Sequence, residues 1–156
     1  MLASHARSAI TEANRQTFYY TNMTPQDEKY LNTGAGSWNK LEAHEMDILP
    51  SGNDTLYVVT GCTFDEPVKY ITSKGGDKCA VPKECYKCFM MCSFRNGQMV
   101  SAKGIGYLMP NNQAGAGDYA PFAKTIDEIE ALTGFNFFAN VPEALQEAAE
   151  SKQTVL

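Results

Sequence analysis

Two strand-like segments joined by a tight turn constrain the fold of this chain more than any other feature. Residues 85–94 (CYKCFMMCSF) and 97–110 (GQMVSAKGIGYLMP) are both rich in apolar and β-favouring residues. Asn96-Gly97 stands between them, and this dipeptide favours the two-residue turn of an antiparallel hairpin. We therefore predict an antiparallel sheet built on this hairpin, with residues 55–61 (TLYVVTG) as a further strand.

The first of these segments carries three of the five cysteines, and its alternation separates them. One face of the strand receives Cys88, Met90 and Cys92, and the other receives Cys85, Lys87, Phe89 and Met91. Cysteines four apart on a strand lie about 13 Å apart, beyond disulfide reach. We therefore expect Cys88 and Cys92 to be buried thiols.

The cysteine content also bears on the cellular compartment. Five cysteines close together in a short chain favour an oxidising compartment, hence a secreted or cell-envelope protein. A disulfide between Cys62 and Cys79 is one expectation, and a zinc site at Cys85, Cys88 and Cys92 is the alternative. A structural zinc wants a second ligand pair, and no histidine lies near these cysteines in the sequence.

Helix patterns flank the predicted strands. Ser37 is a good N-cap for the helical spacing of WNKLEAHEMDIL, which Pro50 ends. Thr125-x-x-Glu128 is a capping box for a helix ending before Gly134, and Pro142 begins a closing helix. These elements predict an α+β domain in which an antiparallel sheet packs on the central helix.

Smaller segments complete the predicted layout. Residues 1–17 contain a short helix-like run, while 17–22 (TFYYTN) and 135–141 (FNFFANV) read as further strands. The expected core includes residues of the central helix and of the three main strands: Trp38, Leu41, Tyr57, Val59, Phe89, Ile105 and Leu108.

Composition limits the class of protein. The 156 residues, 44% hydrophobic and 20% charged, suit one globular domain, and no apolar run is long enough for a membrane span. The first residues, MLASHARSAI, lack the pattern of a secretory signal. A net charge of −5 argues against a protein that coats nucleic acid over its whole surface, although it leaves room for a local basic groove.

Three amides and a glutamate gather around the start of the central helix: Asn22, Gln26, Asn32 and Glu42. Such side chains commonly cap helices or fix turns. The alternative is a metal and phosphate site, because Mg²⁺ prefers oxygen ligands and needs only one or two from the protein.

The residue series resembles a known family. N-x-x-P-Q at 22–26, L-N-x-G at 31–34 and W-x-x-L-E at 38–42 are similar, in this order, to motifs of the DNA/RNA non-specific endonucleases, of the His-Me finger (ββα-metal) superfamily. The similarity continues from about Met1 to Pro142 through further matches at Tyr57–Gly61, Val81-Pro82, Tyr86-Lys87 and 126–138.

The resemblance implies a fold, an activity and roles for residues. The fold would be ββα-metal nuclease-like, and the substrates would be DNA and RNA, hydrolysed with one Mg²⁺ or, as an alternative, Mn²⁺. Asn32 matches the asparagine that binds the metal, Glu42 the glutamate that orients its waters, and Asn22 an amide in the same pocket. Gln26 falls on a glutamine expected to give structural support.

The chain departs from the family pattern at its catalytic base. The D-R-G-H motif, whose histidine takes a proton from the attacking water, does not occur in these residues, and Met1 would stand directly after it. We therefore expect the single domain, residues 1–156, to be the C-terminal part of a longer nuclease domain. Neither His5, whose neighbours do not recreate the motif, nor His44, expected to face solvent, is predicted to replace the base.

Two further departures concern the metal side. Five residues separate Asn32 from Trp38 where the family usually has about three, and Met46 stands where the family often has arginine. The alternatives to an enzyme are a non-catalytic homologue that binds nucleic acid or a partner protein, and a small disulfide- or zinc-stabilised protein unrelated to nucleases.

Overall fold

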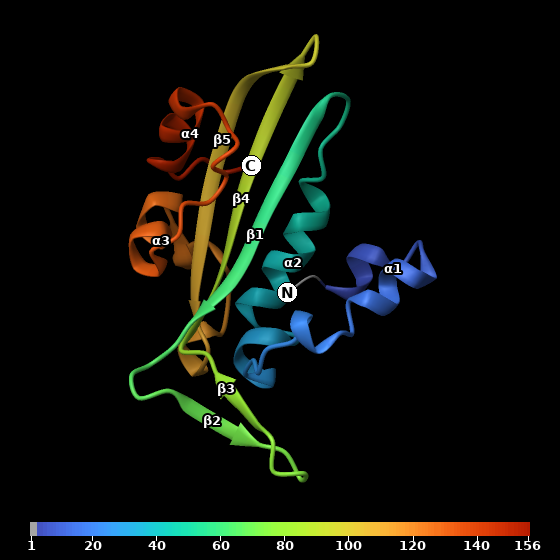
Figure 1. Cartoon of the computed structure of the whole chain (residues 1–156), viewed down its shortest axis with the longest axis vertical. Helices are drawn as coiled ribbons and strands as arrows, with labels where there is room; N and C mark the ends of the chain where they lie inside the picture. The colour runs from blue at the N-terminus through green and yellow to red at the C-terminus, as the bar shows by residue number, and fades with distance from the viewer. Residues whose placement is uncertain (1–2) are drawn as a thin grey trace.

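The centre of the molecule is a four-stranded antiparallel sheet with strand order β1-β4-β5-β6 (Figure 1). The computed structural model describes residues 3–156, apart from the side chain of His5. The sheet consists of β1 (Asp54–Thr63), β4 (Glu84–Arg95), β5 (Gln98–Pro110) and β6 (Ala123–Lys124). A separate two-stranded sheet, which the sequence analysis did not predict, consists of β2 (Lys69–Thr72) and β3 (Lys78–Val81).

Helices cover both faces of the sheet. Helix α2 (Ser37–Asp47) packs on one face, while α3 (Ile126–Thr133) and α4 (Glu143–Glu150) pack on the other, and α1 (Thr11–Gln16) lies farther from the sheet on the α2 side (Figure 1). Single turns make up the remaining helical elements: 3₁₀ turns at Ser4–Arg7, Tyr20–Asn22, Gln113–Gly115 and Ala120–Phe122, and a π-helical turn at Glu28–Asn32. The predicted α+β class is confirmed.

The β4–β5 hairpin has the turn that its sequence predicts. Asn96 and Gly97 both adopt positive φ angles, 51° and 76°, which a two-residue turn of this hand requires. The paired register runs from Arg95 opposite Gln98 to Glu84 opposite Pro110, with one irregularity after Ser93. This long hairpin gives the sheet two faces that the rest of the chain can cover.

The alternation along β4 divides the core as predicted. Cys88, Met90 and Cys92 are buried against α3 and α4, together with Ile126 and Ile129. On the other face, Cys85 and Phe89 are buried in the cluster that contains α2 residues Trp38 and Leu41. The sheet therefore separates two hydrophobic clusters.

One predicted core residue lies at the surface. Tyr57 is 42% exposed, because β1 is the edge strand of the sheet and pairs on one side only, with β4. Val59 and Leu108 are partly buried against the α3–α4 cluster, and Phe89 and Ile105 are fully inside.

Two predicted strands are wrong. The TFYYTN segment forms a 3₁₀ turn at Tyr20–Asn22, because its backbone amides bond to its own neighbours rather than to a strand, and Tyr20 is 92% exposed. The FNFFANV segment is irregular because the Phe137 amide donates to the Glu130 carboxylate rather than to a strand, and Phe138 has a positive φ.

The cysteines form neither the expected disulfide nor the alternative zinc site. All five are free thiols: Cys79 lies exposed on β3, and Cys62 lies opposite Cys85 rather than beside Cys79. Cys85 is on the other face of β4 from Cys88 and Cys92, so these three cannot share a zinc ion. The predicted Cys62–Cys79 disulfide and the zinc alternative are both contradicted.

The C-terminal helices begin as the sequence predicts. Thr125 accepts from the Glu128 amide while the Glu128 carboxylate accepts from the Thr125 amide, and Gly134 ends α3 in the left-handed region. Within the described residues, no helix has the length and apolar character needed to cross a bilayer.

Candidate functional site

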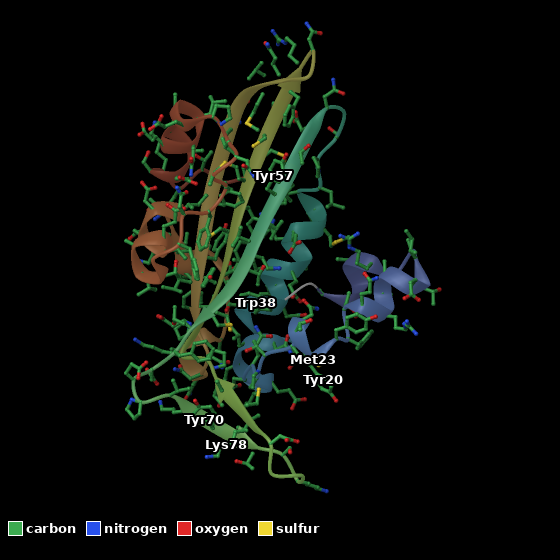
Figure 2. The ribbon with its side chains drawn as sticks, in the orientation of Figure 1. Tyr20, Met23, Trp38, Tyr57, Tyr70 and Lys78 are labelled. Atoms are coloured by element: carbon green, nitrogen blue, oxygen red, sulfur yellow. The ribbon has the colours of Figure 1, made fainter. Side chains whose placement is uncertain are left out.

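The four polar residues singled out at the start of the central helix line one cleft. Asn22, Gln26, Asn32 and Glu42 all contribute to a hollow of about 340 Å³ near the N-terminal end of α2. Met23 and Trp38, labelled in Figure 2, lie in the same wall. Segments that the sequence separates by up to twenty residues are thus brought to a single surface.

Asn32 is positioned by a π-helical turn. It is the last residue of the Glu28–Asn32 turn, and the Asp27 carboxylate caps the start of this turn by accepting from the Tyr30 amide at 2.8 Å. Its neighbour Leu31 is fully buried against α2, so the exposed Asn32 side chain projects from an anchored segment.

The five residues between Asn32 and Trp38 form a compact turn. Gly36 is required there, because a Cβ atom on it would lie 2.1 Å from the Leu31 carbonyl oxygen. Gly36 also forms an isolated bridge with Ala116, which joins the turn to the loop after β5. The turn therefore accommodates the longer spacing between Asn32 and Trp38 and still keeps Asn32 next to α2.

An unpredicted residue, Asn111, fixes the opposite end of this wall. Its side-chain oxygen accepts from the Asp27 amide at 2.7 Å, and its side-chain nitrogen donates to the carbonyls of Pro25 and Pro82 at 3.0 and 3.1 Å. These bonds join the cleft segment to the end of β5 and the start of β4. In the sequence, Asn111 is one of several polar residues in the loop after β5, and no local pattern predicts its contacts with Asp27, Pro25 and Pro82.

Asn22 and Gln26 are each held by a hydrogen bond. The Asn22 amide nitrogen donates to the Thr17 carbonyl at 2.8 Å. The Gln26 amide nitrogen contacts the Cys85 sulfur at 3.6 Å, which ties this residue to the core of the sheet. That contact accords with a supporting role for Gln26.

A chain of polar contacts runs beneath Glu42. The Trp38 indole N–H donates to the Glu42 carboxylate at 2.9 Å, and the Lys87 ammonium lies 5.2 Å from the centre of the Trp38 ring. Lys87 is 2% exposed and forms an ion pair of 2.5 Å with Glu45, which is 13% exposed. The Trp38 indole therefore orients Glu42, and a cation–π contact with the buried Lys87 holds the indole in place. The sequence placed Lys87 on this face but gave no sign of its function.

A larger groove adjoins the cleft. It has a volume of about 650 Å³, runs between α2, β1 and the N-terminal turns, and shares Asn22 with the cleft. Arg7, an exposed cation for which the sequence analysis had no role, lines it together with Lys87. A positive side chain is thus available beside the amides.

His44 does not take part in this arrangement. His44 was expected to face solvent, but it is half-buried and stacks on Tyr119 with ring centroids 5.1 Å apart. It does not line the cleft. The His5 side chain lies outside the described residues. Met46, in place of a family arginine, is 37% exposed and lines the groove.

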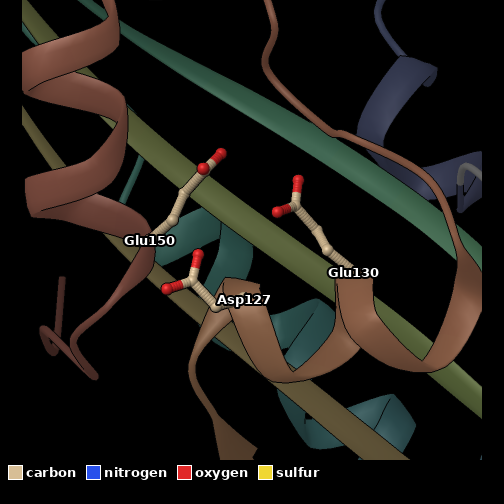
Figure 3. A group of neighbouring side chains, drawn as sticks. All are labelled: Asp127, Glu130 and Glu150. Atoms are coloured by element: carbon tan, nitrogen blue, oxygen red, sulfur yellow. The ribbon is translucent and has the colours of Figure 1, made fainter.

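Three carboxylates gather on the opposite face of the sheet. Asp127 and Glu130 of α3 and Glu150 of α4 turn toward one another, with ligand-type oxygens all within 4.8 Å (Figure 3). Burial raises the pKa of Glu150 to about 7, with the neighbouring Glu130 and Asp127 adding to the shift and a hydrogen bond from Gln146 opposing it. Burial likewise raises the pKa of Glu130. The sequence gave no warning of this acidic cluster, because α3 and α4 meet only in the folded chain.

Comparison with known proteins gives the family. A sequence profile of the DNA/RNA non-specific endonucleases matches residues 1–144. A nuclease of Nostoc sp. is 30% identical over 152 residues, which cover 94% of this chain and 52% of the relative. A nuclease of Serratia marcescens is 29% identical over 140 residues (88% and 49%), and the mitochondrial nuclease EXOG of Xenopus laevis is 31% identical over 137 residues (82% and 36%).

This chain spans about half the length, or less, of the relatives it matches. Its antiparallel sheet with a helix packed on one face agrees with the ββα-metal arrangement that the motifs indicated. By the extent of the profile match, the chain belongs to the DNA/RNA non-specific endonuclease family.

Proposed function

We propose that the cleft at the start of α2 is the metal side of a phosphodiesterase site, and that the protein is a Mg²⁺-dependent endonuclease acting on DNA and RNA. The observation that carries this proposal is the convergence of Asn22, Asn32 and Glu42 on one cleft in a chain of this family. Helix caps would not need to share a cleft, because each cap serves only its own helix.

The donor set suits a hard cation. Asn32 and Glu42 offer an amide oxygen and a carboxylate, which are the ligand types that Mg²⁺ prefers, and the hollow has room for the waters that the ion retains. Asn32 would hold the ion, Glu42 would orient its waters, and Mn²⁺ is the alternative cofactor. When bound, such an ion supplies positive charge to the phosphoryl group and the leaving oxygen.

The protein's own side chains have separate tasks in this proposal. Trp38 fixes the Glu42 carboxylate by its indole N–H, and Gln26 supports the wall from the sheet. The groove next to the cleft admits a polynucleotide backbone, and Arg7 contacts its phosphates there. We assign the proton acceptor to the histidine of the D-R-G-H motif, which these 156 residues do not contain.

The test compares two forms of the protein. The 156-residue chain is expected to cleave plasmid DNA and RNA slowly, because the histidine of the D-R-G-H motif is not among its residues. The same chain, extended by a segment that carries the family's D-R-G-H motif, should cleave both substrates at least about 100-fold faster, in line with the usual contribution of a general base. EDTA should stop the reaction.

A pair of variants locates the metal. In the extended protein, Asn32→Ala should lower Mg²⁺-dependent cleavage by at least about 100-fold, whereas Asp127→Asn, on the other face of the sheet, should change it by less than about two-fold. If Asp127→Asn removes the activity and Asn32→Ala does not, the metal is held by the acidic cluster. Nucleic-acid binding without cleavage in the extended protein would favour the non-catalytic homologue.

A further inference from the structure

We propose that Cys62 and Cys85 are a redox-active pair that closes to a disulfide under oxidising conditions and reopens on reduction. Cys62 of β1 and Cys85 of β4 are directly opposite in the strand register, and their sulfur atoms are 3.7 Å apart. Directly opposite Cβ atoms of antiparallel strands lie about 4.5–5.5 Å apart, close to the spacing that a disulfide spans. Rotation of the two side chains therefore brings the sulfurs together without moving either strand far.

The two thiols differ in access and in acidity. Cys62 is half-buried, whereas Cys85 is fully buried in the same cluster on the α2 face of the sheet. The hydrogen bond with Cys85 lowers the pKa of Cys62, while the same contact and burial raise the pKa of Cys85. Because the thiolate is the reactive form of cysteine, Cys62 attacks the oxidant and Cys85 resolves the product.

The remaining cysteines contrast with this pair. Burial raises the pKa of Cys88 to about 12 and also raises that of Cys92, and both lie on the face covered by α3 and α4. Cys79 is exposed but has no cysteine opposite it, because its partner in the β2–β3 register is Ile71. Among the five cysteines, all within the described residues, only the Cys62–Cys85 pair combines a partly exposed cysteine with a second thiol in reach.

The chemistry with a hydroperoxide is balanced. The Cys62 thiolate attacks one peroxide oxygen, the O–O bond breaks, and the departing hydroxide takes a proton to become water. The Cys85 sulfur then attacks the sulfenic acid on Cys62, loses its proton, and displaces the second oxygen as water. In total, two thiols and one hydrogen peroxide give one disulfide and two waters, with two electrons passing to the peroxide.

Gln26 connects the oxidation state of the pair to the cleft. Its side-chain nitrogen donates to the Cys85 sulfur at 3.6 Å. Gln26 lines the cleft that contains Asn32 and Glu42. Disulfide formation draws the Cys85 sulfur toward Cys62, so it weakens the support of this wall.

The experiment uses the full chain with Cys79→Ser, because the exposed Cys79 thiol would otherwise join two molecules. After treatment with a small excess of hydrogen peroxide, intact mass should fall by two hydrogen atoms and peptide mapping should show a Cys62–Cys85 link in most molecules. Cys88 and Cys92 should remain open to alkylation after denaturation. Dithiothreitol should restore the original mass.

Two further variants make the result specific. Cys62→Ser and Cys62→Ala should each abolish the loss of two hydrogens, and they keep the test valid if one of them folds poorly. In the oxidised protein, amide hydrogen exchange at residues 24–27 should be faster than in the reduced protein, and this change should be absent in both variants.

Several outcomes would overturn the proposal. These are a Cys62 that advances to sulfinic acid while Cys85 stays a thiol, a link between any other pair of cysteines, or unchanged exchange at residues 24–27 once the link has formed. Since no cleavage is measured, these outcomes are independent of whether the cleft is a nuclease site.

Discussion

On the α2 face of the sheet, a buried charge has a partner of opposite sign, whereas on the face covered by α3 and α4 a buried carboxyl lies among other carboxyls. Lys87 pairs with Glu45 under the Trp38 ring. Glu150 instead accepts from the amide of Gln146 and has Glu130 and Asp127 beside it, so a bound proton takes the place of a cation. The second arrangement therefore depends on pH.

The largest change in stability is expected when the buried cation on the α2 face, Lys87, is removed. Lys87→Met leaves the Glu45 carboxylate without its partner, and the free energy of unfolding should fall by on the order of 3 kcal/mol. Urea denaturation at pH 7 measures the loss. The double variant Lys87→Met/Glu45→Leu should regain most of it, because a buried ion pair can be replaced by apolar side chains of similar volume. A double variant as unstable as the single one would contradict this account.

The next largest effect is expected on the α3–α4 face, where the free energy of unfolding should depend on pH through Glu150. The folded-state pKa of Glu150, about 7, is above its unfolded value, so the folded state binds more protons and loses stability as pH rises from about 4.3 to about 7. Glu150→Gln removes this loss and should stabilise the protein at pH 8 by roughly 1–3 kcal/mol, with no difference below about pH 4. Denaturation series at several pH values measure it.

Glu147→Gln is the matched control for that series, since Glu147 is an exposed residue of the same helix. Its unfolding free energy should follow that of the unaltered protein at every pH. If both substitutions gave the same pH dependence, the effect would come from net charge and not from the buried cluster.

A smaller effect is expected where the α2 face orients Glu42. Trp38→Phe keeps a ring over Lys87 but removes the N–H that donates to Glu42, so stability should fall by about 1 kcal/mol. Metal-dependent cleavage by the extended protein should fall by about five-fold, which corresponds to one hydrogen bond. Phe137→Leu, in the cluster of the opposite face, should lower stability without a change in the Mg²⁺ concentration that gives half-maximal cleavage.

The smallest effect concerns the exposed ion pair on the α3 side. Lys124 and Glu128 are 3.4 Å apart, and their side chains are 43% and 49% exposed. Lys124→Ala should change the free energy of unfolding by no more than about 0.5 kcal/mol. Glu128→Ala should cost more than Lys124→Ala, because it also removes one arm of the capping box. Equal effects of Lys124→Ala and Lys87→Met would remove the distinction between the two faces.

The sequence predicted several features that depend on neighbouring residues, although Gly36, and not Ser37 as predicted, is the N-cap residue of α2. The Asn96-Gly97 turn, the alternation of Cys85 and Cys88 and the capping box at Thr125 are local, and the structure confirms each of them. The prediction that Asn22 and Asn32 lie in one site rested instead on the resemblance to the family motifs. The catalytic and metal roles of these residues, and the secreted or cell-envelope location, stay predictions.

The errors and omissions share a different cause. Tyr57 is exposed because β1 lies at the edge of the sheet. The residues of a strand do not by themselves determine its position in the strand order. His44 is covered by Tyr119, which comes from the loop after β5. The contacts of Asn111 and of Glu150 likewise join segments distant in the chain. Such features depend on tertiary packing, which residue patterns alone do not specify.

The contacts of Asn111 also bear on the order in which the molecule assembles. Its bonds to Asp27 and Pro25 join residues 84 and 86 positions apart, whereas the β4–β5 hairpin closes around a two-residue turn. Closing a long loop costs more chain entropy than closing a short one, and Asn111 is held in place only after β5 has paired. We therefore expect the wall that carries Gln26 to be completed late in folding, after the sheet that supports it.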